Sequence, residues 1–189
     1  MNQNSFMPPT PLSRRQFLRG VSFTAAAMAF PSLASATIKK RHPAKHLAFE
    51  NLHTGEQLSV TYFENGHYVN GALKEMNNLL RDHRSGDVFA MDPSLFDLLH
   101  ELQQNLGVRR PIQVISGYRS PATNARLQKQ TSGVATKSLH MLGKAIDIRM
   151  DRVDSKIIQE AAIAMQRGGV GYYPESDFVH VDTGRVRHW

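Results

Sequence analysis

The 189-residue sequence contains no cysteine, and this absence excludes several kinds of protein. A chain without cysteine has no disulfide framework, no thiolate metal site, no cysteine nucleophile and no lipid-modified cysteine of a lipoprotein. The stability of the folded chain must therefore come from a packed core. Any metal site must be built from histidine and carboxylate ligands.

Long apolar runs are also missing. The longest mostly small or apolar stretch, residues 21–30, is interrupted by Ser22 and Thr24 and falls well below the roughly 20 apolar residues of a membrane-spanning helix. It follows the pair Arg14-Arg15 and precedes Ala34-Ser35-Ala36. This order resembles a twin-arginine export signal with its cleavage site.

The N-terminal pattern leads to a prediction for the organisation of the chain. We predict a twin-arginine signal peptide over 1–36, a flexible linker over 37–45 and one folded domain over 46–189. The expected partner during export is the twin-arginine translocase, the destination is the periplasm, and no stable membrane anchor is expected. The domain is expected to be a monomer.

The charge is basic but does not point to nucleic acid. The formal net charge is +7, and removal of the three arginines of residues 1–36 lowers it to +4. Without a cluster of aromatic residues among the remaining basic side chains, this excess suits an anionic polymer or solubility better than nucleic acid. A composition of 41% hydrophobic and 21% charged residues is that of a globular domain.

Hydrophobic spacing predicts an α+β fold, a small antiparallel sheet flanked by helices. Alternating apolar residues predict strands, and apolar residues at helical spacing predict helices. Asp92-Pro93 predicts a capped helix start, and Gly107 predicts the end of that helix. The predicted strands are 47–49, 58–62, 66–69, 111–116, 144–150, 170–172 and 178–181; the predicted helices are 71–84, 93–106, one from about 121, and one around 157–165 that ends at Gly168-Gly169.

A candidate metal site stands out from the nine histidines. His140 lies on a predicted loop, Gly143 allows a close turn, and Asp147 lies on the strand that follows. In the strand 178–181, two-residue periodicity puts His180 and Asp182 on one face. Two imidazoles and one carboxylate without cysteine are typical of a catalytic zinc centre, which keeps a fourth position for water.

Three motifs together resemble a known family. The set consists of Gly117-Tyr118-Arg119-Ser120, then Ser138-Leu139-His140 through Asp147, and finally Phe178-Val179-His180. It is similar to the motifs of the D-Ala-D-Ala carboxypeptidase and endopeptidase metallofamily. The wider clan of this family includes the hedgehog domains. The resemblance implies a fold of that hedgehog-like type and a Zn²⁺ ion held by His140, Asp147 and His180.

The likeness covers essentially the whole chain and is greatest for the branch of periplasmic murein endopeptidases. It extends to Asn51–Glu56, the loop 168–174 and the end Arg187-His188-Trp189. The branch implies peptidoglycan stem peptides as substrate and partner, notably cross-links that join two meso-diaminopimelate residues. The resemblance also implies that Arg119 orients the substrate, because a guanidinium can pair with a carboxylate or stabilise a tetrahedral intermediate.

The general base is where the sequence departs from the family pattern. Relatives carry glutamate three positions before the last histidine ligand, or histidine two positions before it, and here these positions are Asp177 and Phe178. Asp182, on the face of His180, and Asp177 are both candidates for proton transfer, with Asp182 favoured over Asp177, and a purely structural role for both stays open. His188 is a further candidate to support a ligand.

The leading hypothesis is therefore a zinc-dependent murein endopeptidase that hydrolyses peptide cross-links of peptidoglycan during cell-wall remodelling. Two alternatives remain open from the sequence. One is a non-catalytic peptidoglycan-binding protein, since the family glutamate is missing. The other is a D-alanyl carboxypeptidase that trims a terminal D-alanine.

Overall fold

The structure, a computed structural model, describes residues 42–130 and 134–189. The predicted signal peptide over 1–36 and the first residues of the predicted linker lie outside the described residues, and regular structure begins at Lys45. None of the helices in the described ranges is long and apolar enough to cross a membrane.

Within these ranges, eight strands form one sheet in the order β3-β2-β1-β4-β5-β7-β6-β8. Most neighbouring strands are antiparallel, but β1 pairs parallel with β4 and β6 pairs parallel with β8. The α+β class is confirmed, but the sheet is mixed rather than purely antiparallel, and with eight strands it is larger than expected. The strands are β1 Lys45–Asn51, β2 Gln57–Glu64, β3 His67–Tyr68, β4 Ile112–Ser116, β5 Ala145–Met150, β6 Gly169–Tyr173, β7 Phe178–Asp182 and β8 Arg187–His188.

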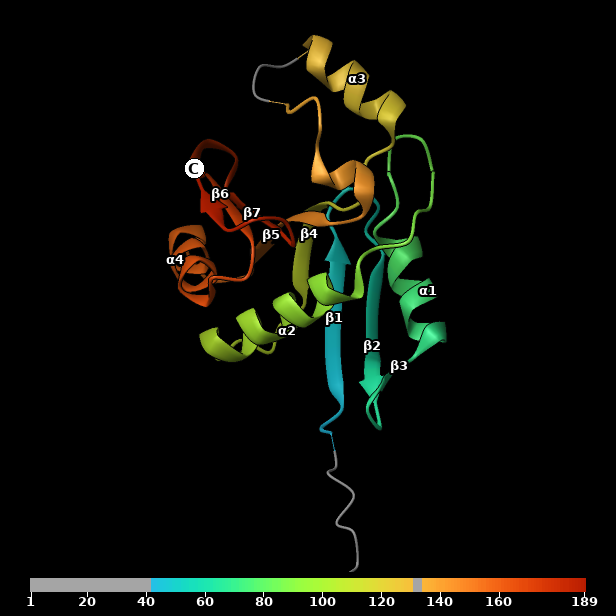
Figure 1. Ribbon diagram of the computed structural model, residues 1–189, viewed down its shortest axis with the longest axis vertical. Coiled ribbons are helices and arrows are strands. Elements are labelled where there is room, and N and C mark those ends of the chain that lie inside the picture. Colours follow the sequence, from blue (N-terminus) through green and yellow to red (C-terminus); the bar gives the residue numbers. More distant parts are fainter. Residues whose placement is uncertain (1–41, 131–133) are drawn as a thin grey trace, which may run out of the picture. The chain divides into compact units, whose positions relative to one another are not determined.

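Helices pack mainly on one face of this sheet. Figure 1 shows α2 crossing in front of β1, with α1 and α4 on either side and α3 apart from them at one end. The helices are α1 Asn70–Leu79, α2 Pro93–Leu106, α3 Pro121–Gln130 and α4 Ser155–Met165, with short 3-10 turns η1 Leu139–Leu142 and η2 Pro174–Ser176. The largest fully buried side chains between helices and sheet are Tyr62, Phe49, Phe96, Leu47, Met76, Leu80, Leu95, Leu99, Leu102, Ile112, Ile146 and Ile148.

The ends of α2 follow the sequence signals. The Asp92 side chain accepts a hydrogen bond from the Ser94 amide, Pro93 occupies the first turn, and Gly107 adopts the left-handed conformation at the C-cap. The Asp92 side chain pairs a backbone N–H that the helix start would leave without a partner, and Pro93 has no N–H to pair. The prediction for this helix is confirmed at both ends.

The end of α4 differs from the prediction. The helix ends at Met165 with Gln166 in the left-handed conformation, and not at Gly168-Gly169. These glycines serve close packing instead, because a Cβ atom on Gly168 would collide with the Asp182 carbonyl and one on Gly169 would collide with the Asp182 and Arg187 side chains. A side chain at either position would push β6 away from its neighbours.

The end of α1 is the clearest error of the prediction. The helix was expected to reach Arg84 but ends at Leu79. Beyond it the chain turns sharply, with the Asp82 amide donating to the Asp87 carbonyl and the Gly86 amide donating to the Asp82 carbonyl. The Leu80 carbonyl accepts from the Tyr118 amide, so this turn pairs with a distant segment. The local spacing of apolar residues cannot predict that long-range contact.

The strands alternate as predicted between a core face and a polar face. On β5, Ile146 and Ile148 belong to the apolar core, and Asp147 points to the opposite face. On β7, Val179 and Val181 belong to the core in the same way. The face opposite the core helices therefore carries the predicted site.

Candidate metal centre

The three predicted ligands come from three neighbouring elements. His140 lies on η1, Asp147 on β5 and His180 on β7. Asp147 and His180 are directly opposite each other in the antiparallel pair of β5 and β7, so their side chains share a face. Gly143 ends η1 in the left-handed conformation and lets the chain turn from His140 into β5.

Their donor atoms form a small triangle. His140 Nε2 lies 3.2 Å from His180 Nδ1 and 3.2 Å from Asp147 Oδ1, and His180 Nδ1 lies 2.8 Å from Asp147 Oδ1. All three residues are buried. Ligands about 2.0–2.1 Å from a tetrahedral zinc ion stand about 3.3 Å from one another. The observed spacing is close to that value.

Hydrogen bonds on the outer side of each ring decide which nitrogen faces the triangle. His140 Nδ1 donates to the Gly117 carbonyl at 2.7 Å, and His180 Nε2 donates to Asp182 Oδ2 at 3.0 Å. Both acceptors lack a proton, so the opposite nitrogen of each neutral ring carries a lone pair. Two imidazole lone pairs and a carboxylate oxygen thus point at one another, an arrangement that a cation or a shared proton must stabilise. The residues fit a metal ion.

The ionisation of the metal-free cluster agrees with this arrangement. Burial disfavours a charged imidazole, but hydrogen bonds to Asp147 and Asp182 outweigh burial and raise the pKa of His180 to about 9. Burial likewise opposes a charged Asp147, yet the two histidines hold the pKa of that carboxyl well below its usual range. The cluster therefore favours positive charge at its centre.

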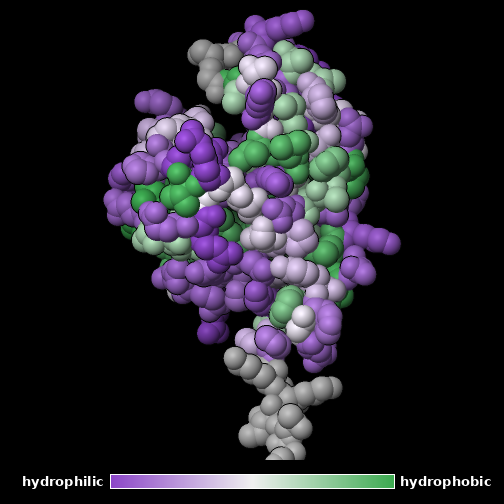
Figure 2. Space-filling view, viewed as in Figure 1, coloured by the Kyte–Doolittle hydropathy of each residue, from purple (hydrophilic) through white to green (hydrophobic). Residues whose placement is uncertain are grey.

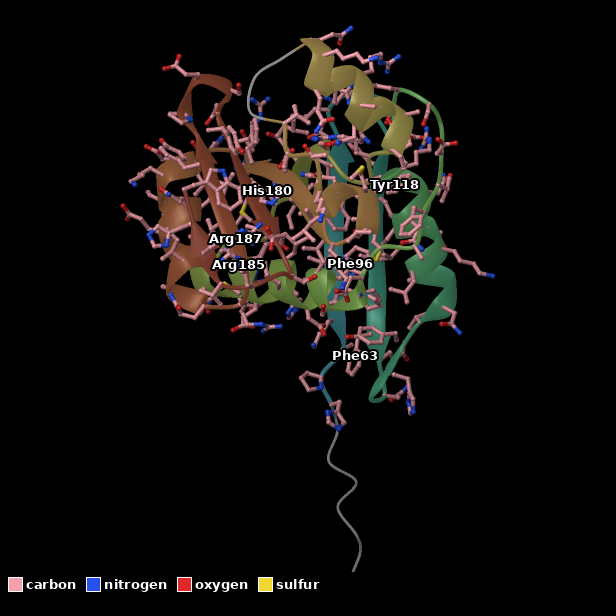
Figure 3. The ribbon with its side chains drawn as sticks, turned by 45° about the horizontal axis from the view of Figure 1, so that its top comes forward. Phe63, Phe96, Tyr118, His180, Arg185 and Arg187 are labelled. Atoms are coloured by element: carbon pink, nitrogen blue, oxygen red, sulfur yellow. The ribbon has the colours of Figure 1, made fainter. Side chains whose placement is uncertain are left out.

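Asp182 supports His180 from behind. It is completely buried, and its two oxygens accept five hydrogen bonds. The donors are His180, the backbone amides of Gly169 and Gly184, and both terminal nitrogens of Arg187. Burial raises the pKa of Asp182, but the hydrogen bonds from His180 and Arg187 dominate and lower it. Figure 3 shows His180 and Arg187 together on the C-terminal strands.

The other candidate base lies outside this cluster. The Asp177 side chain is 64% exposed, and its carboxylate lies 3.8 Å from Arg149 Nη1. Asp177 follows η2 in the left-handed conformation, between Ser176 and Phe178, which both line the cavity beside the triad. His188 and Glu175 are exposed.

Arg119 lies at the edge of the triad. Its Nη2 is 3.8 Å from Asp147 Oδ2, and its Nη1 donates to Asn124 Oδ1 at 3.4 Å. Its buried Nε–H has no hydrogen-bond partner among the described residues. An unpaired buried donor is costly unless a ligand completes it, so the side chain is prepared to bind an acceptor.

The triad opens into a cavity of about 380 Å³. In Figure 2 the surface is notched between the end that carries α3 and the part formed by β6 and β7. The cavity walls combine aromatic rings with cationic groups, a surface suited to an extended peptide with carboxylates. Besides the triad, these wall residues include Arg119, Lys137, Arg187, Tyr173, Phe178 and Trp189.

Arg187 and Trp189 are among the wall residues that had no role assigned from the sequence. Arg187 holds Asp182, and its guanidinium lies over the ring of Trp189 at 4.9 Å. Trp189 Nε1 donates to the Tyr173 hydroxyl at 3.0 Å, and its ring lies 5.3 Å from that of His180. The alternation of Arg187 and Trp189 around His188 is a two-residue period that could have indicated a last short strand.

Known proteins with similar sequences point in the same direction. Residues 39–189 match the family described as "Peptidoglycan L,D-endopeptidase MepK". A protein of that name from Escherichia coli (strain K12) is 44% identical over 179 residues, 94% of this chain and 97% of the relative. A "Probable peptidoglycan L,D-endopeptidase MepK" from Haemophilus influenzae is 46% identical over 144 residues, 76% of this chain and 77% of the relative.

Proposed function

This chain belongs to the peptidoglycan L,D-endopeptidase MepK family, and on that premise we propose that it hydrolyses L,D-peptide cross-links of peptidoglycan with a zinc ion held by His140, Asp147 and His180. The observation that carries the proposal is the triangle of buried donor atoms, which lie within 4.8 Å of one another and line a cavity. Zinc suits two imidazoles and one carboxylate.

A zinc ion bound there would act as a Lewis acid on the scissile carbonyl and on the attacking water. The protein's own residues prepare this chemistry. Gly117 and Asp182 hold the two imidazoles in the tautomers that leave their lone pairs free. Arg119 binds a carboxylate of the substrate or the negative charge that develops at the carbonyl, and its unpaired Nε–H supports this role.

We assign different tasks to the two candidate aspartates. Asp182 already accepts five hydrogen bonds and has a lowered pKa, which makes it a poor proton acceptor and a good support for His180. Asp177 is exposed and stands between two residues of the cavity wall. The proton-transfer role therefore goes to Asp177.

The charges of the cavity wall favour a substrate that carries carboxylates. Arg187 is neutralised by Asp182, whereas Lys137 lines the cavity without an ion pair among the described residues. Lys137 and Arg119 together offer positive charge to a peptide that carries free carboxylates. Cross-links between two meso-diaminopimelate residues carry such groups beside the scissile amide, and we propose them as the preferred substrate.

Peptidoglycan lies outside the cytoplasmic membrane, so the enzyme acts there. We propose that the twin-arginine signal over 1–36 delivers it to the periplasm. Replacement of Arg14 and Arg15 by lysine should leave the protein in the cytoplasm, as fractionation would show. Unchanged export of that variant would contradict the proposed route.

The central experiment is digestion of purified cross-linked muropeptides. Zinc-loaded protein should convert dimers joined through two diaminopimelate residues into monomers, detected by liquid chromatography and mass spectrometry. His180→Ala should lose both zinc and turnover, whereas Asp177→Asn should keep zinc and lose turnover. Unchanged dimers with zinc-loaded protein would refute the proposed activity.

A further inference from the structure

Three consecutive backbone amides around Arg119 are held by two segments that are distant in the sequence. The Tyr118 amide donates to the Leu80 carbonyl at 2.8 Å, and the Arg119 amide donates to the His140 carbonyl at 3.2 Å. The Ser120 amide donates to Asp82 Oδ2 at 3.0 Å. The backbone that carries Arg119 is therefore clamped between the turn after α1 and the turn that carries His140.

Asp82 is the charged member of this clamp, and it is only 1% exposed. Its Oδ2 accepts from the Ser120 hydroxyl at 2.8 Å as well as from the Ser120 amide, and its Oδ1 accepts from the Arg84 amide at 3.0 Å. Its own backbone closes the turn with Gly86 and Asp87. A buried carboxylate with this many partners strongly specifies one local geometry.

The clamp also reaches the Arg119 side chain through α3. The Ser120 hydroxyl accepts from the Thr123 amide, and the Ser120 carbonyl accepts from the Asn124 amide at 2.9 Å, so Ser120 starts the helix. Asn124 Oδ1 in turn accepts from Arg119 Nη1. A shift of Ser120 would move both the peptide next to Arg119 and the helix that holds its guanidinium.

Close packing also holds the turn after α1 against the turn before α3. A Cβ atom on Gly117 would lie 2.9 Å from the Leu80 Cβ and would also collide with the Leu80 carbonyl. Glycine therefore allows the turn after α1 to lie directly against the turn before α3. Since the Gly117 carbonyl accepts from His140 Nδ1, this contact borders the metal ligands as well.

We propose that Asp82 is a positioning residue: by holding Ser120 it sets where the Arg119 guanidinium meets the substrate. The inference rests on the role of Arg119 proposed above. Asp82 itself contacts neither the triad nor the cavity wall in the described residues, so its effect on the reaction passes through Arg119.

The test uses the full chain with Asp82→Asn. Asparagine has almost the same size but replaces one carboxylate oxygen with an NH₂ donor group, so it cannot accept from both the Ser120 and Arg84 amides, which bond different oxygens of Asp82. The matched control is Asp97→Asn. Asp97 also lies in a polar network, with Lys45, Tyr62 and Tyr68, but none of these residues lines the cavity.

The first readout needs no turnover. The buried Arg119 Nε–H should give its own peak in a ¹H–¹⁵N spectrum, assigned by its loss in Arg119→Lys. We expect Asp82→Asn to shift or broaden this peak and Asp97→Asn to leave it in place. An unchanged peak in Asp82→Asn would overturn the inference, even if the protein proved unable to cleave cross-links.

The second readout is a double-mutant cycle on kcat/KM. Because small misplacements of a substrate-binding group are costly, Asp82→Asn should lower kcat/KM by about 10- to 100-fold. In an Arg119→Lys background the same change should cost less than about twofold, with zinc content unaltered. Equal losses in both backgrounds would show that Asp82 acts on general stability and not through Arg119.

A milder variant covers the case in which Asp82→Asn does not fold. Ser120→Ala removes the hydroxyl bond to Asp82 and the acceptor of the Thr123 amide but keeps the Ser120 amide bond. It should move the Arg119 peak in the same direction and reduce kcat/KM by a smaller factor. A folded Ser120→Ala protein with an unmoved peak would count against the proposal.

Discussion

Replacement of Asp182 by asparagine tests how the protein controls the tautomer of His180, a proposed metal ligand. In the native chain Asp182 Oδ1 accepts from the Gly169 and Gly184 amides, and Oδ2 accepts from His180 Nε2. Asparagine would keep its oxygen toward the two backbone donors, and its NH₂ group would face His180. The ring must then present an acceptor at Nε2 and carry its proton on Nδ1, the atom that faces the triangle.

The size of the effect follows from this proton. Zinc can bind His180 in the variant only after the ring returns to the unfavourable tautomer or the asparagine turns against its backbone donors. Loss of such supporting contacts lowers metal affinity by about 10- to 100-fold, or about 1.4–2.8 kcal/mol. The ion pair of Arg187 with Asp182 is lost in addition, so we expect the upper half of this range.

The assay is a competition titration with a coloured zinc chelator at constant pH. Asp154→Asn is the matched control, because Asp154 caps α4 through the Lys156 amide and asparagine caps a helix equally well. The control should bind zinc like the unmodified protein. If Asp182→Asn bound zinc within twofold of the unmodified protein, Asp182 would not set the tautomer of His180.

Three further predictions follow from other features. Removal of metal by a chelator should abolish cleavage of muropeptide dimers and added zinc should restore it, whereas full turnover by protein shown to be metal-free would contradict the proposed chemistry. In Gly171→Val the added Cβ would lie 2.6 Å from the ring of Trp189, the single tryptophan. The fluorescence emission of Trp189 should therefore shift to longer wavelength, and kcat/KM should fall. An unchanged emission spectrum would refute the contact. Burial raises the pKa of Asp82, but hydrogen bonds from Thr123, Ser120 and Arg84 outweigh burial and hold this pKa well below its usual range. The charged Asp82 therefore contributes to the stability of the fold above about pH 4, and this contribution is lost as pH falls through the lowered pKa. Urea unfolding at several pH values should therefore show a smaller loss of stability on acidification for Asp82→Asn than for the unmodified protein.

Several parts of the fold are readable from the sequence because their causes are local. The caps of α2 depend on Asp92, Pro93 and Gly107, each within one turn of the helix end that it stabilises. The two faces of β5 and β7 depend on side-chain alternation, which is a property of any strand. The same alternation predicts that Asp147 and His180 leave the core on one side.

The proposed metal ligands are also predictable, for a related reason. His140 and Asp147 are joined by a short turn with Gly143 in the left-handed conformation, so their approach is nearly local. Only His180 comes from a distant strand, and its motif resembles that of a known family. The sequence could not reveal the register of β5 and β7, which places Asp147 directly opposite His180.

What the sequence by itself determined is the α+β class, the capped helices, the alternating strands and the triad of candidate ligands, because short-range geometry and residue chemistry specify them. Only the tertiary structure decided where α1 ends, which aspartate supports His180 and which one faces solvent. It also brought Asp82 against Ser120, 38 positions away. These features depend on contacts between segments that are distant in the sequence, and a local sequence pattern does not show which distant residue will be the partner.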